Sequence, residues 1–283
     1  MEEDIRLFLN YLSKEKKCSK NTLDAYHNDL HQLAEYIASV NGSEVPGKGS
    51  RGLSEEHLKQ YMLNLKLKSY TLSTVARKVA AARTFLKFMA DRGKVNDDLA
   101  PKLAAPKVNK SVPKVLSVQE VQKLLAETAK SPAVDSKRDR AMLELLYASG
   151  LLASELMALN VENVKHNNIE VNGQRGKARV ITLDKRVADI VGEYVDTVRI
   201  KLLTRDKEKA LFLNQRGERL TRQGFWQIVQ GYADMAGISS KVTPRTIRHS
   251  YAVHRLNGGA NIEDIQEVLG HAHISTTKAY KNV

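Results

Sequence analysis

The stretch TPRTIRHSYAVHRLNGGANIEDIQEVLGHAHISTTKAY, residues 243–280, carries a dense set of side chains suited to phosphate chemistry. Pro244 suits the first turn of a helix, and on that helix Arg245 and Arg248 are three residues apart and share one face. Two guanidinium groups side by side repel each other unless an anion lies between them, and their planar N–H groups match phosphate oxygens. The pair therefore predicts a phosphate-binding helix.

Downstream of Arg248 the chain supplies a second set of reactive side chains. His249 follows directly, His271 comes after a short predicted helix, and Ser275–Thr277 are predicted to cap a last helix that carries Tyr280. A phenol with a pKa of about 10 is a poor nucleophile, but arginines on the phosphate and a nearby imidazole favour its deprotonation and attack. The segment therefore contains the parts for phosphoryl transfer to a tyrosine.

The net charge points to the same class of partner. The 283 residues contain 45 Lys and Arg against 32 Asp and Glu, which gives a formal charge of +13 and a pI near 9.6. This balance favours nucleic acid over a membrane, because the sequence has no apolar run long enough to span a bilayer and no signal peptide. The single cysteine, Cys18, excludes an intramolecular disulfide and fits a reducing cytoplasm.

Four histidines near the C-terminus also raise the question of a metal site; they are His249, His254, His271 and His273. The chain has one cysteine and no His-Glu-x-x-His spacing, so this alternative is weak, and neither a metal nor another cofactor is expected. His249, His254 and His273 are expected to pack or to cap helices.

The chain is predicted to be mainly α-helical and to form two domains. Residues 1–100 show repeated apolar faces at the helical period, and 101–115 form a linker that contains lysines and prolines. Most of 116–283 again shows the helical period, but 167–184 alternate polar and apolar residues around a basic turn at 173–177 and predict a β-hairpin. The expected architecture is a helical N-terminal domain followed by a mixed α/β domain.

Local signals predict where several helices begin and end. In the N-terminal domain, Ser54 is a predicted N-cap and Gly93 a predicted C-cap. In the C-terminal domain, Ser117 and Glu120 have the spacing of a capping box, and Gly150 is predicted to end the helix that precedes it.

The order of these motifs resembles that of the tyrosine recombinases, and most closely the Xer group. The resemblance rests on RHSYA, then GGA, then LGHAHISTT followed by a tyrosine, and on RDRAMLELLYASGLLASELMALN at the start of the second domain. FLNYLSKEKKCSKNTLDAYHNDL resembles the family's N-terminal DNA-clamping helices, and ARKVAAARTFLKFMADRG resembles the approach to its linker. The resemblance covers nearly the whole chain and implies a SAM-like N-terminal domain and a catalytic domain of the tyrosine recombinase type.

The resemblance also implies roles for individual residues. Tyr280 would attack a scissile phosphate of DNA, form a 3′-phosphotyrosyl link and release a 5′-hydroxyl. Arg248 matches the second family arginine, and His271 matches the His/Trp position that precedes the nucleophile. No metal or nucleotide is implied, because the bond energy is kept in the covalent link and a second 5′-hydroxyl reverses the step.

Two positions depart from the family pattern. Leu152, in ASGLLASEL, stands where relatives carry the first arginine. An aliphatic side chain cannot donate a hydrogen bond to phosphate, and the loss of one such donor typically costs roughly 10²–10³ in rate. Arg245 stands where relatives usually carry a histidine. Its guanidinium can donate to a phosphate oxygen, but it stays protonated and cannot shuttle a proton.

The hairpin turn departs from the pattern as well. Relatives have a sequence like Gly-Lys-Gly-Asn-Lys-Glu-Arg, which puts Gln174 at the position of the usual lysine and Lys177 at a second lysine. Lys177 is therefore the expected donor of the leaving-group proton, and Arg175 is the less favoured alternative. Arg175 is also the candidate to replace the arginine that is absent at Leu152.

These inferences predict a site-specific recombinase that cuts and rejoins double-stranded DNA recombination sites. It is expected to act as a homotetramer on paired sites, in the cytoplasm and in association with the nucleoid, and to resolve chromosome or plasmid dimers. Three alternatives stay open: phage-type integration, a catalytically impaired DNA-binding protein of recombinase descent, and a single-protein system of the archaeal kind in place of one with a second recombinase.

Overall fold

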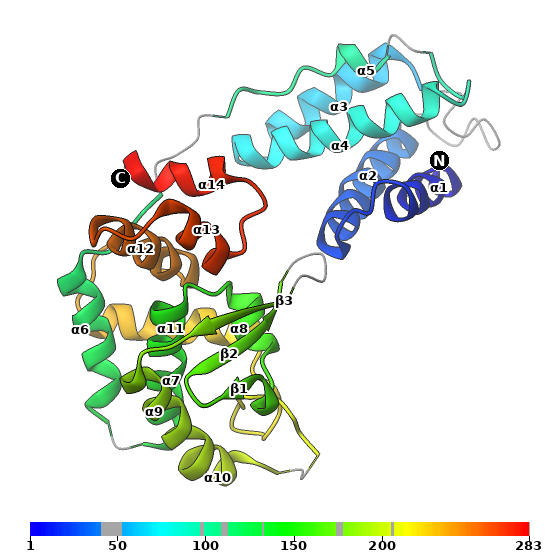
Figure 1. Cartoon of the computed structure of the whole chain (residues 1–283). Helices are drawn as coiled ribbons and strands as arrows, with labels where there is room; N and C mark the ends of the chain where they lie inside the picture. The colour runs from blue at the N-terminus through cyan, green and yellow to red at the C-terminus, as the bar shows by residue number, and fades with distance from the viewer. Residues whose placement is uncertain are drawn as a thin grey trace. The chain divides into compact units, whose positions relative to one another are not determined.

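The structure, a computed structural model, describes residues 1–40, 53–96, 99–108, 113–131, 133–173, 178–204 and 207–282. The chain divides into two compact units, Met1–Lys110 and Ser111–Val283, and each unit has its own hydrophobic core (Figure 1). The division falls within the stretch 101–115. Within the described ranges, no helix is both long enough and apolar enough to cross a bilayer.

The described part of the first unit is built from helices. They are α1 (Glu2–Lys14), α2 (Lys20–Val40), α3 (Glu55–Leu67), α4 (Leu72–Ala90) and the short α5 (Leu99–Lys102). Phe8 of α1 lies at the centre of the core, with its ring centroid 5.5 Å from that of Phe85 and 5.2 Å from that of Phe88, both on α4. Aromatic packing of this kind joins the first helix to the fourth.

Two predicted helix signals in the first unit are confirmed. The Ser54 hydroxyl accepts a backbone N–H from the first turn of α3, as an N-cap should. Gly93 has a φ of +63° and closes the turn that follows α4, where the Lys94 N–H reaches back 3.0 Å to the Met89 carbonyl. The regular helix itself ends at Ala90, three residues before this glycine.

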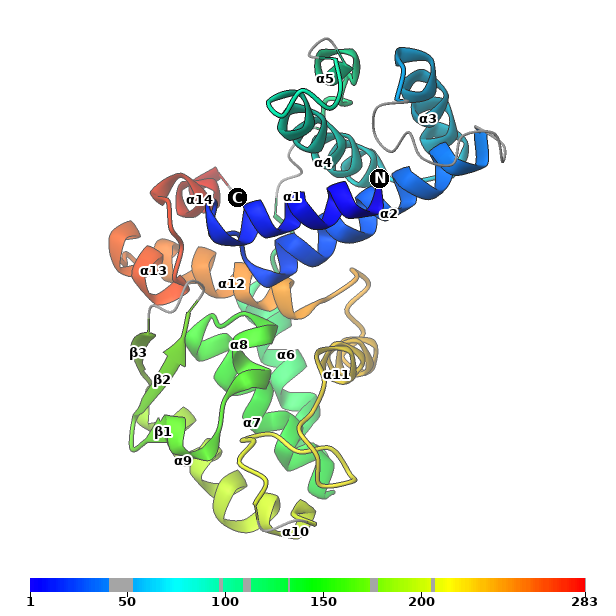
Figure 2. The ribbon, with the colours of Figure 1, turned by 90° about the vertical axis from the view of Figure 1, so that its right-hand side faces the viewer.

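The second unit combines helices with one small sheet (Figures 1 and 2). Its helices are α6 (Val118–Ala129), α7 (Val134–Ser149), α8 (Ala153–Ala158), η3 (Val161–Asn163), α9 (Lys185–Glu193), η5 (Tyr194–Arg199), α10 (Ile200–Leu202), α11 (Arg222–Met235), α12 (Pro244–Asn257), α13 (Ile262–Leu269), α14 (Ile274–Lys278) and η6 (Ala279–Asn282). Its strands are β1 (Val164–Lys165), β2 (Asn168–Asn172) and β3 (Ala178–Thr182). Figure 2 shows α6, α8, α9 and α11 arranged around α7, with the strands along one edge.

Capping explains where the central helices of this unit begin and end. Ser117 and Glu120 form the predicted capping box at the start of α6. Gly150 ends α7 with a φ of +59°, and a Cβ at this position would lie 2.5 Å from the ring of Tyr251. Both the backbone angle and the close contact require glycine here. Pro244 begins α12, as the sequence predicted.

The sheet contains the predicted hairpin and one further strand. Strand β2 pairs antiparallel with both neighbours, and Ile169 lies opposite Ile181 of β3 and Val164 of β1. Ile169 and Ile181 are buried and their strand neighbours are exposed, so one face of the hairpin covers the core. The two-residue strand β1 is too short to show a period and was not predicted. The π-helical turn η5, which continues α9, also had no sequence signal.

The start of the last helix was predicted wrongly. The sequence suggested Ser275–Thr277 as its cap, but α14 begins at Ile274 with His273 at the N-cap position. Thr277 is fully buried inside the helix, and its hydroxyl lies 2.9 Å from His271 Nδ1. The threonine therefore holds a histidine side chain and does not cap the backbone.

Candidate active site

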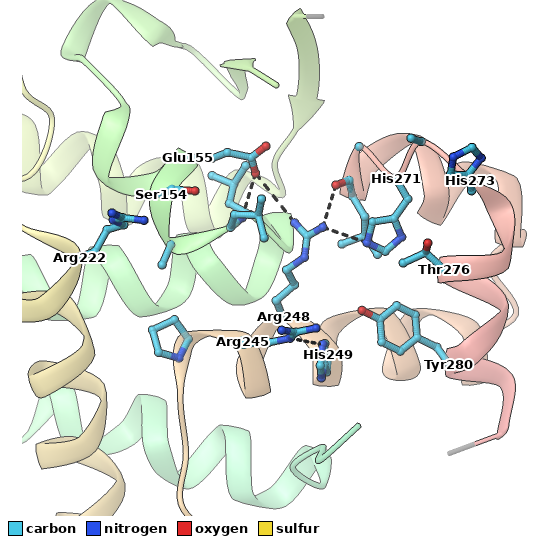
Figure 3. Close-up of a pocket in the computed structure, with 17 residues that line it drawn as sticks. Ser154, Glu155, Arg222, Arg245, Arg248, His249, His271, His273, Thr276 and Tyr280 are labelled. Carbon is cyan, nitrogen blue, oxygen red and sulfur yellow. Dashed lines mark hydrogen bonds and ion pairs between the residues drawn. The ribbon is translucent and has the colours of Figure 1, made fainter. Parts of the chain in front are cut away.

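A pocket of about 490 Å³ lies in the second unit where α12 meets the C-terminal segment (Figure 3). Its walls come from residues 151–155 at the start of α8, from the first half of α12, and from 269–280, with Arg222 of α11 at one side. The sequence-predicted residues Arg245, Arg248, His271 and Tyr280 all line it. Positions far apart along the chain thus converge on one cavity.

Arg248 is the fixed centre of the pocket. Its side chain is 4% exposed, Nη1 donates to the Gly150 carbonyl at 2.6 Å, and Nη2 donates to the Leu269 carbonyl at 2.8 Å. These carbonyls lie at the C-terminal ends of α7 and α13, where the helix dipoles favour a cation. Burial lowers the pKa of Arg248 and the nearby Glu155 raises it; a guanidinium in this setting stays charged.

His271 is held in one orientation by hydrogen bonds at both ring nitrogens. Arg248 Nη2 lies 3.1 Å from Nε2, and because a guanidinium only donates, Nε2 accepts and the ring proton is on Nδ1. Nδ1 then donates to the buried Thr277 hydroxyl at 2.9 Å. Burial first, and then Arg248, lowers the pKa of His271 to about 4, so the ring is neutral at pH 7.

Tyr280 lies in η6 with its ring packed on His249 and His271, two of the three histidines that line the pocket. The ring centroids are 5.4 Å from His249 and 6.2 Å from His271, and the tyrosine is 6% exposed. Figure 3 shows its hydroxyl turned into the pocket on the side of Arg248. Burial raises the pKa of Tyr280, and the charges of Arg248 and Arg245 oppose that rise. A bound phosphate between these groups would meet the phenol oxygen directly.

Arg245 and Leu152 mark the departures from the family pattern. Arg245 is exposed at the pocket, and its Nε donates to His249 Nε2 at 3.3 Å. Leu152 is half-buried in the pocket wall, and its backbone N–H donates to Glu155 Oε2 at 2.9 Å. The pocket is therefore lined by an aliphatic side chain at Leu152 and by an exposed cation at Arg245. Lys177 and Arg175 lie at 174–177, outside the described residues.

The sequence did not indicate the residues that support the pocket. Arg179 forms a two-bonded pair with Glu155, with N–O distances of 2.8 and 2.9 Å, and its Nε donates to the Val268 carbonyl at 2.8 Å. A Cβ on Gly270 would lie 3.1 Å from the Arg179 guanidinium, so this glycine, with a φ of +68°, lets the arginine pass beneath it. Two features of the sequence could have pointed to these residues: Glu155 lies three residues after Leu152, the spacing of a capping box, and a glycine, Gly270, precedes His271.

We expect Arg179→Met to lower the free energy of unfolding of the second unit by about 3–5 kcal/mol, because it leaves the buried Glu155 carboxylate without its two-bonded partner and with only Arg248, 3.9 Å away, as a cation. The side chains of Arg179 and Glu155 are only 11% and 8% exposed. Trp226, the single tryptophan, lies in α11 and reports denaturant unfolding of this unit. Adding Glu155→Gln should recover most of the loss. Lys137→Met, which breaks an ion pair that is about half exposed, should change stability by less than about 1 kcal/mol.

The neutral state of His271 predicts a pH dependence of stability. In the unfolded chain the pKa of His271 is about 6.5, whereas in the folded protein it is about 4. Between these two pH values the unfolded chain therefore binds a proton that the folded protein does not bind. The stabilisation is therefore complete above pH 6.5 and is lost as the pH falls from 6.5 to 4. We expect His271→Gln to reduce the fall in the free energy of unfolding between pH 6.5 and pH 4 by roughly 1–3 kcal/mol. The exposed His273→Gln should leave it unchanged; an equal effect of both would contradict the assignment.

Comparison with known proteins gives the chain its family. Residues 114–283, more than half of the chain, match the phage integrase family, and residues 5–93 match the N-terminal SAM-like domain of phage integrases. Tyrosine recombinase XerC of Roseiflexus sp. (strain RS-1) is 39% identical over 287 residues, which cover 100% of this chain and 90% of the relative. Tyrosine recombinase XerD of Listeria innocua serovar 6a is 36% identical over 286 residues, covering 100% and 95%.

Solved structures show the same fold at lower identity. The XerH site-specific recombinase bound to difH substrate, in a pre-cleavage complex, matches with a TM-score of 0.72 and 18% identity over 99% of this chain and 80% of that chain. A lambda integrase dimer bound to a COC′ core site matches with a TM-score of 0.73 and 13% identity over 99% and 95%. The predicted fold class and family are confirmed. The chain belongs to the phage integrase family, and within it to the tyrosine recombinases of the Xer type, which are DNA strand-transferring enzymes.

Proposed function

We propose that Tyr280 is the nucleophile of this recombinase, that Arg248 and Arg245 hold the scissile phosphate in front of it, and that His271 holds Arg248 in place. The observation that carries the proposal is the position of Arg248, a buried cation fixed by two helix ends in the pocket that Tyr280 closes. Arg248 has five N–H groups and uses three in the bonds described above. Of the other two, one is on Nε and one is on Nη1, whose nitrogen lies 3.9 Å from Glu155 Oε2, and we propose that these two serve a phosphate oxygen.

The chemistry follows from these positions. Tyr280 Oη attacks phosphorus, a 3′-phosphotyrosyl bond forms and the bond to the 5′-oxygen breaks. Arg248 and Arg245 stabilise the charge on the non-bridging oxygens, and fixed donors of this kind are the largest contribution to most such reactions. His271, held by Thr277, keeps Arg248 in place and packs on the Tyr280 ring. Since all of these groups line one pocket of one chain, we propose that cleavage occurs in cis.

We further propose that Lys177 gives the leaving 5′-oxygen its proton, with Arg175 the alternative. Arg179 supports this, because it lies two residues after Lys177 and its guanidinium bonds to Glu155 in the pocket wall. A duplex with a 5′-bridging sulfur needs no such proton. Lys177→Ala is therefore expected to cleave that substrate at close to the wild-type rate and the normal substrate far more slowly; equal losses on both would refute the role.

The wider assignment covers the substrate, the assembly and the biological role. XerH has been solved on difH DNA, and lambda integrase as a tetramer on a Holliday junction. For this chain we propose a double-stranded recombination site bound by two pairs of subunits, with residues 1–100 clamping the duplex, 101–115 following the phosphates and 116–283 cutting. The proposed role is resolution of chromosome or plasmid dimers in the cytoplasm, at the nucleoid; phage-type integration is the alternative within the same chemistry.

A second candidate function follows from Leu152. If no other cation replaces the missing arginine, the chain binds recombination sites and does not transfer strands. Both functions include salt-dependent DNA binding through many phosphate contacts, so binding does not separate them.

The deciding experiment incubates the protein with a nicked suicide duplex that carries a candidate site and looks for an adduct that resists SDS. A recombinase gives an adduct that is absent in Tyr280→Phe, while the variant still binds the duplex. Tight site-specific binding without an adduct at any pH or time would establish the DNA-binding alternative.

A further inference from the structure

His249 is a pocket residue to which the mechanism above gives no role. It lies on α12 one turn after Arg245, is half-buried, lines the pocket and packs its ring against Tyr280 with the centroids 5.4 Å apart (Figure 3). Its one hydrogen bond among the described residues is the contact from Arg245 Nε to its Nε2, which is long at 3.3 Å. The proposed nucleophile, Tyr280, therefore lies beside the His249 imidazole, whose Nε2 accepts only one long hydrogen bond.

The basic nitrogen of His249 is available at neutral pH. Because Arg245 can only donate, Nε2 accepts and carries the lone pair, and the ring proton is on Nδ1. Burial, followed by the charges of Arg245 and Arg248, lowers the pKa of His249 to about 4. The unprotonated form, which a proton acceptor needs, is thus the populated form.

His271 is in the opposite condition. Its Nε2 accepts from Arg248 and its Nδ1 donates to Thr277, so both nitrogens are committed. Protonation of Nε2 would break the bond to Arg248 and set two cations against each other. His271 can orient groups in the pocket, but it cannot take the phenol proton without dismantling the support of Arg248.

We propose that His249 accepts the proton of Tyr280, the role that Arg245, as a permanent cation, cannot fill. The inference rests on the proposed function. When a DNA phosphate enters, the exposed Arg245 guanidinium turns to a non-bridging oxygen and releases His249 Nε2. The Tyr280 O–H bond then breaks, its proton goes to Nε2, and the phenol oxygen bonds to phosphorus. The bond from phosphorus to the 5′-oxygen breaks, and that oxygen takes a proton from Lys177 or from water.

The charges around His249 make this acceptor dependent on the substrate. From its own helix it faces Arg245 and Arg248, and from the C-terminal segment Tyr280 and the neutral His271. The two arginines oppose an imidazolium ion in the free protein. A phosphodiester bound between them brings a negative charge that offsets theirs and raises the pKa of His249. The base gains strength only when there is a phosphate to attack.

The test measures single-turnover adduct formation on the nicked suicide duplex from pH 4 to pH 9. We expect the wild-type rate to fall toward acid pH, and His249→Gln to be slower by at least about 10²-fold, within the range for general acid–base catalysis, and to lose that fall. The affinity of His249→Gln for DNA should stay within about threefold of that of the wild type, because the substitution leaves every proposed phosphate donor in place. His254→Gln is the matched control, because His254 lies on the same helix and bonds Tyr147 outside the pocket lining.

The double variant Arg245→His/His249→Gln separates a base from a packing residue. It moves the imidazole one helical turn back to the position where the family carries histidine, and we expect it to regain at least about tenfold in rate together with the acid limb. An unchanged rate in His249→Gln, or a slower rate with the acid limb retained and no recovery in the double variant, would overturn the role of His249 alone. A wild type that forms no adduct at any pH would instead overturn the proposed function, and this inference with it.

Discussion

Leu152→Arg is expected to raise the rate of DNA cleavage by about 10²–10³-fold. A single donor aimed at the charge that develops on a phosphate is worth about this much, and the resemblance to the tyrosine recombinases implies an arginine at this position. The wild-type leucine contributes no donor, so the variant adds an interaction that strengthens in the transition state and does not merely tighten binding.

The structure has a place for the new guanidinium. Leu152 and Arg248 line the same pocket, and Leu152 is partly exposed there. Glu155, whose carboxylate already accepts the Leu152 backbone N–H, lies close enough to orient an arginine there. That carboxylate already pairs with Arg179 and lies 3.9 Å from Arg248 Nη1, so it is the acidic group nearest to the charge that the variant adds.

The measurement is the single-turnover rate of adduct formation with saturating protein, which removes differences in affinity. Ser154→Arg is the matched control, because Ser154 is exposed, lines the same pocket and receives the same added charge two residues away. We expect it to gain less than about tenfold, the share that a general increase in positive potential supplies. If Leu152→Arg gives no gain, another group already fills the site, and Arg175 is the first to be tested by substitution with alanine.

Much of the scaffold could be predicted because its signals are local. Ser54, Ser117 and Gly150 stop or start helices through bonds and backbone angles that span a single turn, so their residue types reveal them. The hairpin could be recognised because its apolar residues alternate. In contrast, β1 has two residues and no period, and nothing in its composition sets it apart.

The candidate site was predicted in part for a related reason. Arg248, His271 and Tyr280 could be named from motif order, and the structure brings them into one pocket. The groups that support them could not, because a buried contact depends on packing between distant segments. Threonine is a common residue at helix N-caps, so the sequence suggested that role for Thr277. Only the tertiary structure shows that its hydroxyl binds His271. Arg179 is one of many basic residues until the fold sets it against Glu155.

Arg248→Lys is expected to lower the cleavage rate by about 10³-fold while DNA binding changes little. The variant keeps the positive charge, so any loss reports geometry. A lysine ammonium is a single point with three donors, whereas the guanidinium reaches carbonyls on two helix ends and His271 at the same time. The ammonium can satisfy some of these acceptors or the phosphate, but not all together, and one misplaced donor already costs about 10²–10³ in rate.

A stability measurement and a control variant separate this loss from unfolding. The free energy of unfolding, followed by Trp226 fluorescence, should fall by only about 1–3 kcal/mol, since one buried carbonyl loses its donor while the charge beside Glu155 remains. Arg255→Lys, on the same helix but exposed and outside the pocket lining, should match the wild type in both rate and stability. A rate for Arg248→Lys within tenfold of wild type would show that charge alone suffices at this position. The fixed guanidinium would then not be what aligns the phosphate with Tyr280.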